Sequence, residues 1–228
     1  MTLQTKELGY YYLDGSKNRY IFQDLNLTFE KGVFYSILGK SGSGKTTLLS
    51  LLSALDSPKE GEILLDGISL KVMGLASYRR NKIGIVFQNF NLIPYMTAVE
   101  NVMVVMSVTD NQSNVSAKEY ALNLLKSVEI DQTTAERLVS NLSGGEQQRV
   151  AIARSLATNC DIIIADEPTG NLDDDTAVGV IDIFRKLVDE ENKCVIMVTH
   201  SQEIATKTDI IMYLNKGSIN ILKKKEVV

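Results

Sequence analysis

The chain has 228 residues, of which 44% are hydrophobic and 23% charged, and its net charge at pH 7 is −4. This length suits one well-buried domain with room for a smaller subdomain. The negative charge excludes the strongly basic surface that is typical of nucleic-acid-binding proteins, so we expect no nucleic-acid partner. The single basic cluster, residues 223–225, is expected to be a solvated tail.

Three features of the sequence predict a cytoplasmic protein. Residues 1–10 contain no apolar core and therefore do not form a secretory signal peptide. The longest apolar runs have the size of strands and are too short to span a bilayer. Cys160 and Cys194 lie beside or within such runs, so we expect buried thiols in a reducing compartment and not a disulfide.

The first part of the chain has the pattern of short antiparallel strands. Alternating segments between Tyr10 and Phe29 are interrupted at Asp14 and Gly15, and a second pair is interrupted at Asp66 and Gly67. Both patterns predict hairpins of a separate antiparallel sheet.

Later in the chain, continuous apolar runs alternate with amphipathic stretches. The runs are residues 33–38, 83–87, 162–165, 195–199 and 210–214. They predict an α/β fold with a mostly parallel core sheet covered on both faces. The stretch of about 89–157 lacks comparable strands and has helical spacing, so we expect a single domain over residues 1–228 with a helical subdomain inserted at 89–157.

A glycine-rich loop follows the first of these runs. Residues 39–46 read G-K-S-G-S-G-K-T between a strand and a helical stretch, which is the phosphate-loop motif in its required context. Its glycines let backbone N–H groups surround phosphate oxygens at a helix N-terminus. Lys45 is expected to reach the β- and γ-phosphates, and Thr46 to ligate Mg²⁺. The nucleotide-binding residues predicted here are Gly39, Lys40, Ser41, Gly42, Ser43, Gly44, Lys45, Thr46 and Thr47.

Two carboxylates end the apolar run 162–165. Ligands of open α/β sheets bind at the carboxyl ends of strands, where Asp166 and Glu167 are expected to lie. Asp166 is predicted to hold Mg²⁺, usually through water, and Glu167 to polarise the water that attacks the γ-phosphate. An Asp-Glu pair after a strand more often belongs to an ordinary turn or a helix N-terminus. The phosphate loop upstream favours the catalytic interpretation here.

A second glycine-containing segment, residues 142–149, reads L-S-G-G-E-Q-Q-R. Ser143 and Glu146 fit a capping box that opens a helix. Gly144 and Gly145 are costly at a helix start unless something approaches the backbone closely, and the N–H groups there form an anion site. Capping and phosphate binding are compatible at this position.

These three segments together resemble the ATP-binding cassette (ABC) nucleotide-binding domains, over essentially the whole chain. The resemblance implies that two copies pack head to tail and that each ATP lies between one copy's phosphate loop and the other copy's L-S-G-G segment. Ser143, Gly144, Gly145 and Glu146 would then bind ATP held by the partner. The resemblance also implies a separate integral membrane permease and a position on the inner face of the cell membrane.

Four further positions match the family pattern. Gln88 resembles the Q-loop glutamine that senses Mg²⁺ and the attacking water, and Asp173 belongs to a match of the D-loop at the dimer interface. His200 resembles the switch histidine that contacts the γ-phosphate. Tyr12 is similar to the aromatic residue that stacks on adenine, with its neighbour Tyr11 as the alternative.

Within the family, residues 86–94, 97–102 and 165–173 resemble the macrolide-exporter and lipoprotein-release branch, which also contains antimicrobial-peptide detoxification ATPases. The expected function is ATP hydrolysis that powers export, antimicrobial-peptide resistance or mechanotransmission. The alternative is a soluble ABC ATPase that acts on a nucleic acid or a ribosome. The short single cassette without a basic face argues against that alternative.

Overall fold

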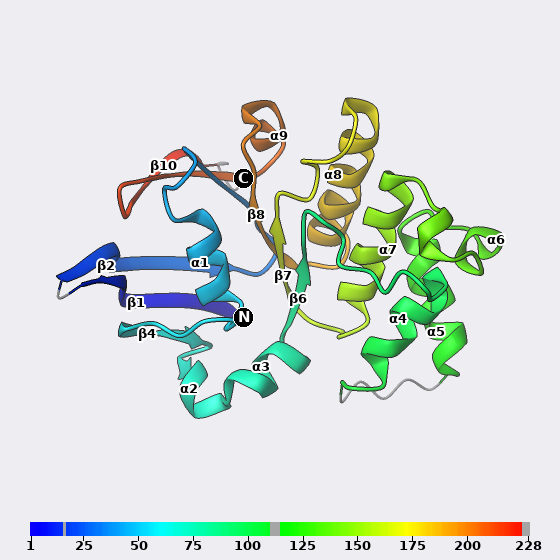
Figure 1. Cartoon of the computed structure of the whole chain (residues 1–228), viewed down its shortest axis with the longest axis horizontal. Helices are drawn as coiled ribbons and strands as arrows, with labels where there is room; N and C mark the ends of the chain where they lie inside the picture. Colours follow the sequence, from blue (N-terminus) through cyan, green and yellow to red (C-terminus); the bar gives the residue numbers. More distant parts are fainter. Residues whose placement is uncertain (16, 110–114, 225–228) are drawn as a thin grey trace.

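The computed structural model describes residues 1–15, 17–109 and 115–224, with side chains described up to residue 222. The basic cluster at 223–225 therefore lies outside the described side chains. Two sheets and the helices around them form the molecule (Figure 1). The strands are β1 (Thr2–Asp14), β2 (Lys17–Glu30), β3 (Phe34–Gly39), β4 (Glu60–Leu65), β5 (Ile68–Ser69), β6 (Ile83–Val86), β7 (Ile162–Asp166), β8 (Cys194–Val198), β9 (Ile210–Asn215) and β10 (Ser218–Lys224). The helices are α1 (Lys45–Leu52), α2 (Leu70–Met73), α3 (Leu75–Asn81), α4 (Ala98–Met106), α5 (Ala117–Ser127), α6 (Gln132–Ala135), the 3₁₀ helix η1 (Val139–Asn141), α7 (Gly144–Leu156), α8 (Asp174–Asp189) and α9 (Gln202–Thr206).

The first sheet is antiparallel, with strand order β2-β1-β4-β5, as the hairpin patterns predict. Its first strand starts at Thr2, eight residues before the expected hairpin. The sequence hides this start because a polar residue, Thr5, points inward and donates its hydroxyl hydrogen to the carbonyl of Leu25 at 2.8 Å. Register shifts on either side of Leu8 also interrupt the alternation.

The second sheet has the order β10-β9-β3-β8-β7-β6. Strands β6, β7, β8, β3 and β9 are parallel, and they match the five predicted runs to within one residue at every boundary. Only the edge strand β10 is antiparallel to its neighbour. The sheet is therefore mostly parallel, as expected.

Alternate residues of the central strands enter two different cores. Ile163 and Ala165 of β7 pack on the side of α4, α5, α7 and α8. Ile162 and Ile164 pack on the opposite side, against α1 and the antiparallel sheet. This period-two alternation buries both faces of the sheet and explains why the strands read as continuous apolar runs. The two cysteines are buried and free, and they lie in different cores, Cys160 in the first and Cys194 in the second.

Helices α4 to α7 follow β6 and gather on one side of the molecule, at the right of Figure 1. Within the described residues from 87 to 161 there is no named strand, only an isolated bridge between Thr97 and Leu138.

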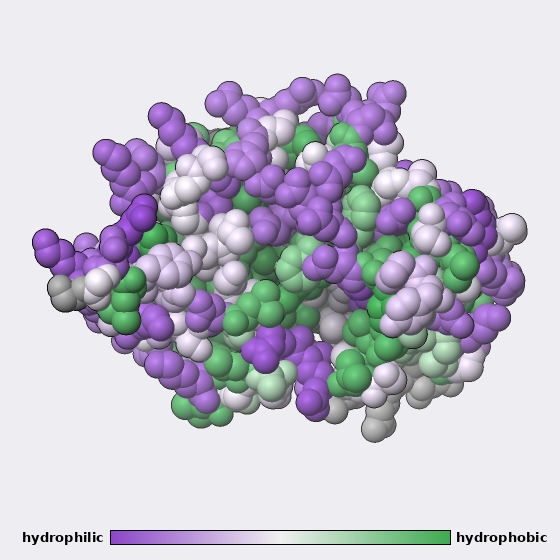
Figure 2. Space-filling model, in the orientation of Figure 1, coloured by the Kyte–Doolittle hydropathy of each residue, from purple (hydrophilic) through white to green (hydrophobic). Residues whose placement is uncertain are grey.

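The N-terminal ends of α1, α7 and α8 all point toward the upper edge of the view in Figure 1. Figure 2 shows that hydrophilic side chains cover much of this edge. A helix N-terminus has unpaired N–H groups and a partial positive charge, so three such ends along one polar edge favour anionic ligands.

Candidate functional site

The glycine-rich loop connects β3 to α1 and has no side-chain cap at the helix start. Gly44 occupies the cap position with φ of 102°, where a Cβ would lie 2.7 Å from the Cγ2 atom of Ile21. Only glycine suits this backbone, because both the conformation and the neighbour exclude a side chain. The loop thus turns tightly, and the first N–H groups of α1 remain available to a ligand.

Lys45 is the first residue of α1, and its side chain folds back along the loop. Its Nζ atom donates hydrogen bonds to the carbonyl oxygens of Gly39 at 2.8 Å and Lys40 at 3.0 Å. Burial lowers the pKa of Lys45, while the carboxylates of Glu167 and Asp166 act in the opposite direction. The ammonium group is therefore held inside the loop and close to the acidic end of β7.

The two acids lie where the sequence predicts, at the carboxyl end of β7. Burial raises the pKa of Asp166 and the neighbouring Glu167 raises it further, while Lys45 and His200 lower it. A half-buried carboxylate with a second acid beside it favours a cation at this position. The loop lysine, both acids and the histidine thus form one electrostatically coupled group, although Lys45 and His200 are 155 residues apart in sequence.

Glu167 and His200 are in direct contact. The Nε2 atom of His200 lies 2.6 Å from Oε1 of Glu167. The backbone of Glu167 has φ of 47°, and its N–H donates to the carbonyl of Val198 at 3.0 Å, at the end of β8. This link between the ends of two adjacent strands holds the carboxylate and the imidazole together in a hollow that Thr169 and Gly170 also line.

Gln88 lies two residues beyond the end of β6, beside the segment that follows Glu167. Its Nε2 atom donates to Oδ1 of Asn171 at 3.4 Å, and Asn171 donates from Nδ2 to the carbonyl of Gln88 at 3.1 Å. Within the described part of the chain, the Oε1 atom of Gln88 accepts no hydrogen bond. Asn171 is not among the predicted site residues, because its role as a partner of Gln88 depends on a contact across 83 positions.

The L-S-G-G segment opens α7 with the predicted capping box. Ser143 donates from its N–H and its hydroxyl to Oε2 of Glu146 at 2.7 and 2.8 Å, and the N–H of Glu146 donates back to the serine oxygen at 3.3 Å. The same hydrogen bonds lower the pKa of Glu146. The side chain of Glu146 is thus occupied by the cap, and the two glycines expose the backbone between them.

Asp173 caps the start of α8 and lies beside this segment. Its carboxylate accepts hydrogen bonds from the N–H of Thr176 at 3.0 Å and from the Thr176 hydroxyl at 2.8 Å. Residues 143–146 and Asp173 line one hollow of about 470 Å³. Thr176 also lines it, and the sequence does not indicate this residue because no motif marks the position against which Gly145 packs.

The two candidate tyrosines differ in exposure and packing. Tyr11 packs against Tyr20 with ring centroids 5.1 Å apart. Tyr12 is 50% exposed and touches the edge of Tyr10, with centroids 5.3 Å apart. Tyr10 is buried in the core shared with α1, so Tyr12 lies on the sheet face that continues toward the phosphate loop. This arrangement favours Tyr12 as the exposed stacking surface.

The predicted residues line three hollows, of which the one at Ser143–Glu146 adjoins the one at Glu167 and His200 through Leu172. One hollow, of about 400 Å³, is lined by loop residues 40–43, and Glu167 and His200 line another. The hollow at Ser143–Glu146 shares no lining residue with the hollow at the loop. Within one copy of the chain, the second anion site is therefore separate from the first.

The parallel sheet, the loop at the start of α1 and the acidic end of β7 define a nucleotide-binding protein of the phosphate-loop class. Residues 22–170 match the family described as ABC transporter. An uncharacterized ABC transporter ATP-binding protein of Bacillus subtilis, YclH, is 46% identical over 226 residues, which is 99% of each chain. The lipoprotein-releasing system ATP-binding protein LolD of Treponema denticola is 43% identical over 210 residues, 90% of this chain and 91% of that one.

Solved structures also show similarity to ABC transporter cassettes. The cassette MJ0796 of Methanocaldococcus jannaschii, described as a dimeric bacterial ABC transporter cassette, superposes with a TM-score of 0.88 at 39% identity, covering 99% of this chain and 100% of that one. A second structure of that cassette, with the same score, is described as a post-hydrolysis state bound to ADP and Pi.

The chain belongs to the ABC transporter family, and within it to the subunits that bind and hydrolyse ATP. The relatives match the macrolide and lipoprotein-release branch, as the resemblance predicts, and they favour a transport role over the nucleic-acid or ribosome alternative. In the described ranges, no helix has the length and apolar character that crossing a membrane requires.

Proposed function

We propose that this chain hydrolyses ATP as a head-to-tail homodimer with two composite sites, each shared between the copies. The observation that carries the proposal is the separation of the two anion sites within one copy. The hollow at Ser143–Glu146 has no lining residue in common with the hollow at the phosphate loop. An antiparallel pair of copies would bring each loop opposite the other copy's L-S-G-G segment, and the dimeric MJ0796 cassette supports the formation of a dimer.

In this proposal, the loop residues Gly39–Thr47 bind the phosphates of ATP through backbone N–H groups and the ammonium group of Lys45. Lys45 is now bonded to two backbone carbonyls, and it would exchange these acceptors for the more strongly charged phosphate oxygens. Tyr12 stacks on the adenine ring. Across the dimer interface, Ser143, Gly144, Gly145 and Glu146 at the start of α7 and Asp173 at the start of α8 complete the site.

The proposed Mg²⁺ ligands are Thr46, Asp166 and Gln88, which offer a hydroxyl, a carboxylate and an amide oxygen. This all-oxygen set suits Mg²⁺, which is commonly held by one or two carboxylates together with substrate phosphates. The described residues contain no group of three or more His, Cys, Asp or Glu side chains placed to hold a metal. When bound, the ion would neutralise charge that develops on the phosphates.

Hydrolysis transfers the γ-phosphoryl group to water, so the residues act mainly by positioning and by charge stabilisation. Glu167 would orient and polarise the attacking water, and His200, 2.6 Å from it, would fix the carboxylate and contact the γ-phosphate. Lys45 stabilises the negative charge on the β- and γ-phosphates. Gln88 links this centre to the segment between β7 and α8 through its hydrogen bonds with Asn171.

We further propose that the chain is one ABC ATP-binding domain, in which residues of about 89–157 act as a helical subdomain. This subdomain and Gln88 would contact a separate integral membrane permease on the inner face of the cell membrane. The name of the lipoprotein-releasing relative supports such a partner. The work performed would be export, antimicrobial-peptide resistance or mechanotransmission.

The test of the catalytic assignment is the substitution Glu167→Gln. We expect it to retain ATP binding and to lower the hydrolysis rate at least about 100-fold, because it removes the acid–base group but keeps its shape. Phosphate release and fluorescent-nucleotide binding measure the two quantities. The matched control is Glu203→Gln, an exposed acid in the first turn of α9, which should leave both unchanged. Hydrolysis by Glu167→Gln at the wild-type rate would refute the assignment.

A further inference from the structure

We propose that Arg19 is a nucleotide-binding residue of this chain, acting in a cationic hollow beside the phosphate loop that attracts and holds the triphosphate. The proposal rests on the proposed ATP site and extends it to a residue that none of the family motifs contains. The hollow, of about 400 Å³, is formed by three segments: residues 19–21 of β2, residues 40–43 of the loop and the β9–β10 turn at 215–217.

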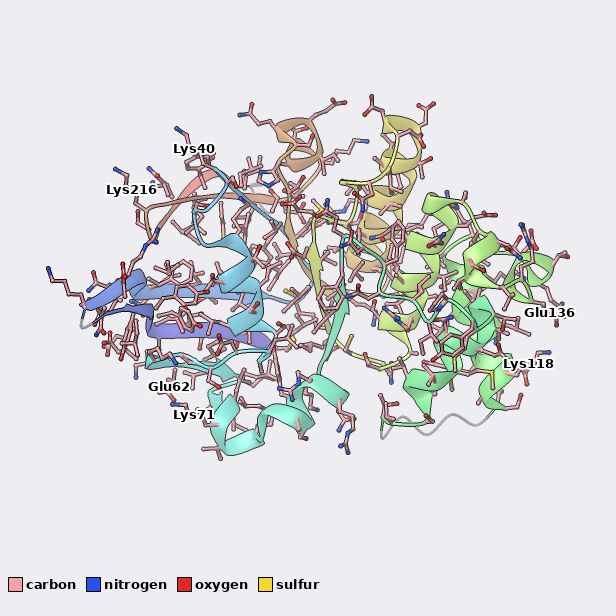
Figure 3. The ribbon with its side chains drawn as sticks, in the orientation of Figure 1. Lys40, Glu62, Lys71, Lys118, Glu136 and Lys216 are labelled. Carbon is pink, nitrogen blue, oxygen red and sulfur yellow. The ribbon has the colours of Figure 1, made fainter. Side chains whose placement is uncertain are left out.

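Three cations and no carboxylate line this hollow. Arg19, Lys40 and Lys216 contribute the positive charges. None of them has an ion pair or a side-chain hydrogen bond with another residue in the described ranges 1–15, 17–109 and 115–224. Figure 3 shows Lys40 and Lys216 at the same corner of the molecule, both directed outward. Since like charges repel, a concave site with three unpaired cations is favourable mainly when an anion enters it.

The strand register places Arg19 opposite Tyr12, the residue proposed to stack on adenine. Arg19 is the cross-strand partner of Tyr12 in the β1–β2 hairpin, and such partners project from the same face of a sheet. Two residues further along β2, Ile21 lies against Gly44 at the start of α1. A nucleotide that stacks on Tyr12 and places its phosphates over the loop would therefore pass along Arg19.

The chemistry of arginine suits this position. Its planar guanidinium group can donate two hydrogen bonds to phosphate or ribose oxygens and carries a permanent charge. Lys40 and Lys216 are exposed, as Arg19 is, but their ammonium groups cannot form the paired hydrogen bonds of a guanidinium, so they would contribute mainly to the field that draws in the anion. Arg19 is thus expected to affect the dissociation of ATP, and the two lysines its association.

The experiment measures association and dissociation rates of a fluorescent ATP analogue by stopped flow at several salt concentrations. Arg19→Ala should weaken binding by about tenfold or more, mainly through faster dissociation. Arg19→Lys should recover part of the affinity, because lysine keeps the positive charge. The recovery should be incomplete, because lysine cannot donate the paired hydrogen bonds of a guanidinium group. The double variant Lys40→Ala/Lys216→Ala should bind the ATP analogue more slowly, and its association rate should depend less on the salt concentration.

The matched control is Lys17→Ala, an exposed cation on the same strand that does not line the hollow. It should bind as the wild type does, and circular dichroism checks that each variant is folded. Wild-type affinity in a folded Arg19→Ala variant, with binding lost in Lys45→Ala, would overturn this inference and leave the ATP site intact. Failure of the wild type itself to bind ATP would overturn the proposed function as well.

Discussion

Among single residues, Glu167 combines a left-handed backbone conformation with a direct side-chain contact to His200. Its positive φ is uncommon for a residue with a side chain and costs on the order of 1–3 kcal/mol. The hydrogen bond to Val198 and the contact with His200 hold it in this conformation. Residues of this kind cluster at active sites, which agrees with the catalytic role proposed for Glu167.

Glu146 allows a prediction about pH, because its cap hydrogen bonds hold its pKa below the ordinary value of 4.5. A carboxylate with a depressed folded-state pKa adds stability above the unfolded-state pKa, and this stability is lost as the pH falls through the folded-state pKa. We expect Glu146→Ala to lower the free energy of unfolding by about 1 kcal/mol at pH 7. The difference from wild type should shrink as the pH falls below about 4.5.

Urea unfolding over a pH series measures this difference. The control is Glu100→Ala, which removes the same capping box from α4, where Thr97 takes the place of Ser143. That variant should also be less stable, yet it should hydrolyse ATP at the wild-type rate, since α4 begins away from the proposed site. If the stability loss in Glu146→Ala stays constant down to pH 4, the ionised carboxylate of Glu146 is not the source of the stabilisation.

At the level of elements, the starts of α7 and α8 are packed tightly together. A Cβ atom on Gly145 would overlap the methyl group of Thr176, whereas one on Gly144 would lie 3.6 Å from Leu172, an ordinary contact. Of the two glycines, therefore, only Gly145 is required for packing. Gly144 is exposed, and its absence of a side chain keeps the backbone open to a ligand.

We therefore expect Gly145→Ala to lower the free energy of unfolding by about 1–3 kcal/mol, because the added methyl group forces α7 and α8 apart. Gly144→Ala should be close to wild type. Adding Thr176→Ser to Gly145→Ala should restore much of the stability, since serine lacks the methyl group and keeps the hydroxyl bonded to Asp173. Chemical denaturation of the four proteins measures this, and a stable Gly145→Ala variant would refute the packing argument.

The helix starts also show what could be predicted from sequence. The capping box at Ser143 and Glu146 is local, so the spacing of the two residues was sufficient. The contact of Gly145 with Thr176 is between two helices and has no sequence signature. The start of β1 was missed for a related reason, because the inward-facing residue Thr5 is polar and its partner, the carbonyl of Leu25, lies on the next strand.

At the level of the whole molecule, the core strands were predicted well because each is buried on both faces and reads as one apolar run. The placement of Asp166, Glu167 and His200 at one edge followed from the parallel sheet, whose strand ends meet there. The bonds between Gln88 and Asn171, and the position of Arg19 beside the loop, depend on how the antiparallel sheet and the connecting segments pack on this frame. Sequence spacing carries no information about that packing.

The central claim is that each ATP site is shared by two copies, and light scattering of the Glu167→Gln variant tests it most directly. With ATP and Mg²⁺ the variant should have the mass of a dimer, and with ADP that of a monomer, because the second anion site is proposed to bind the γ-phosphate. Adding Gly144→Asp, which places a negative charge at the start of α7, should keep ATP binding and leave a monomer. A monomeric Glu167→Gln variant saturated with ATP, or a dimer that persists with Gly144→Asp, would contradict the shared site.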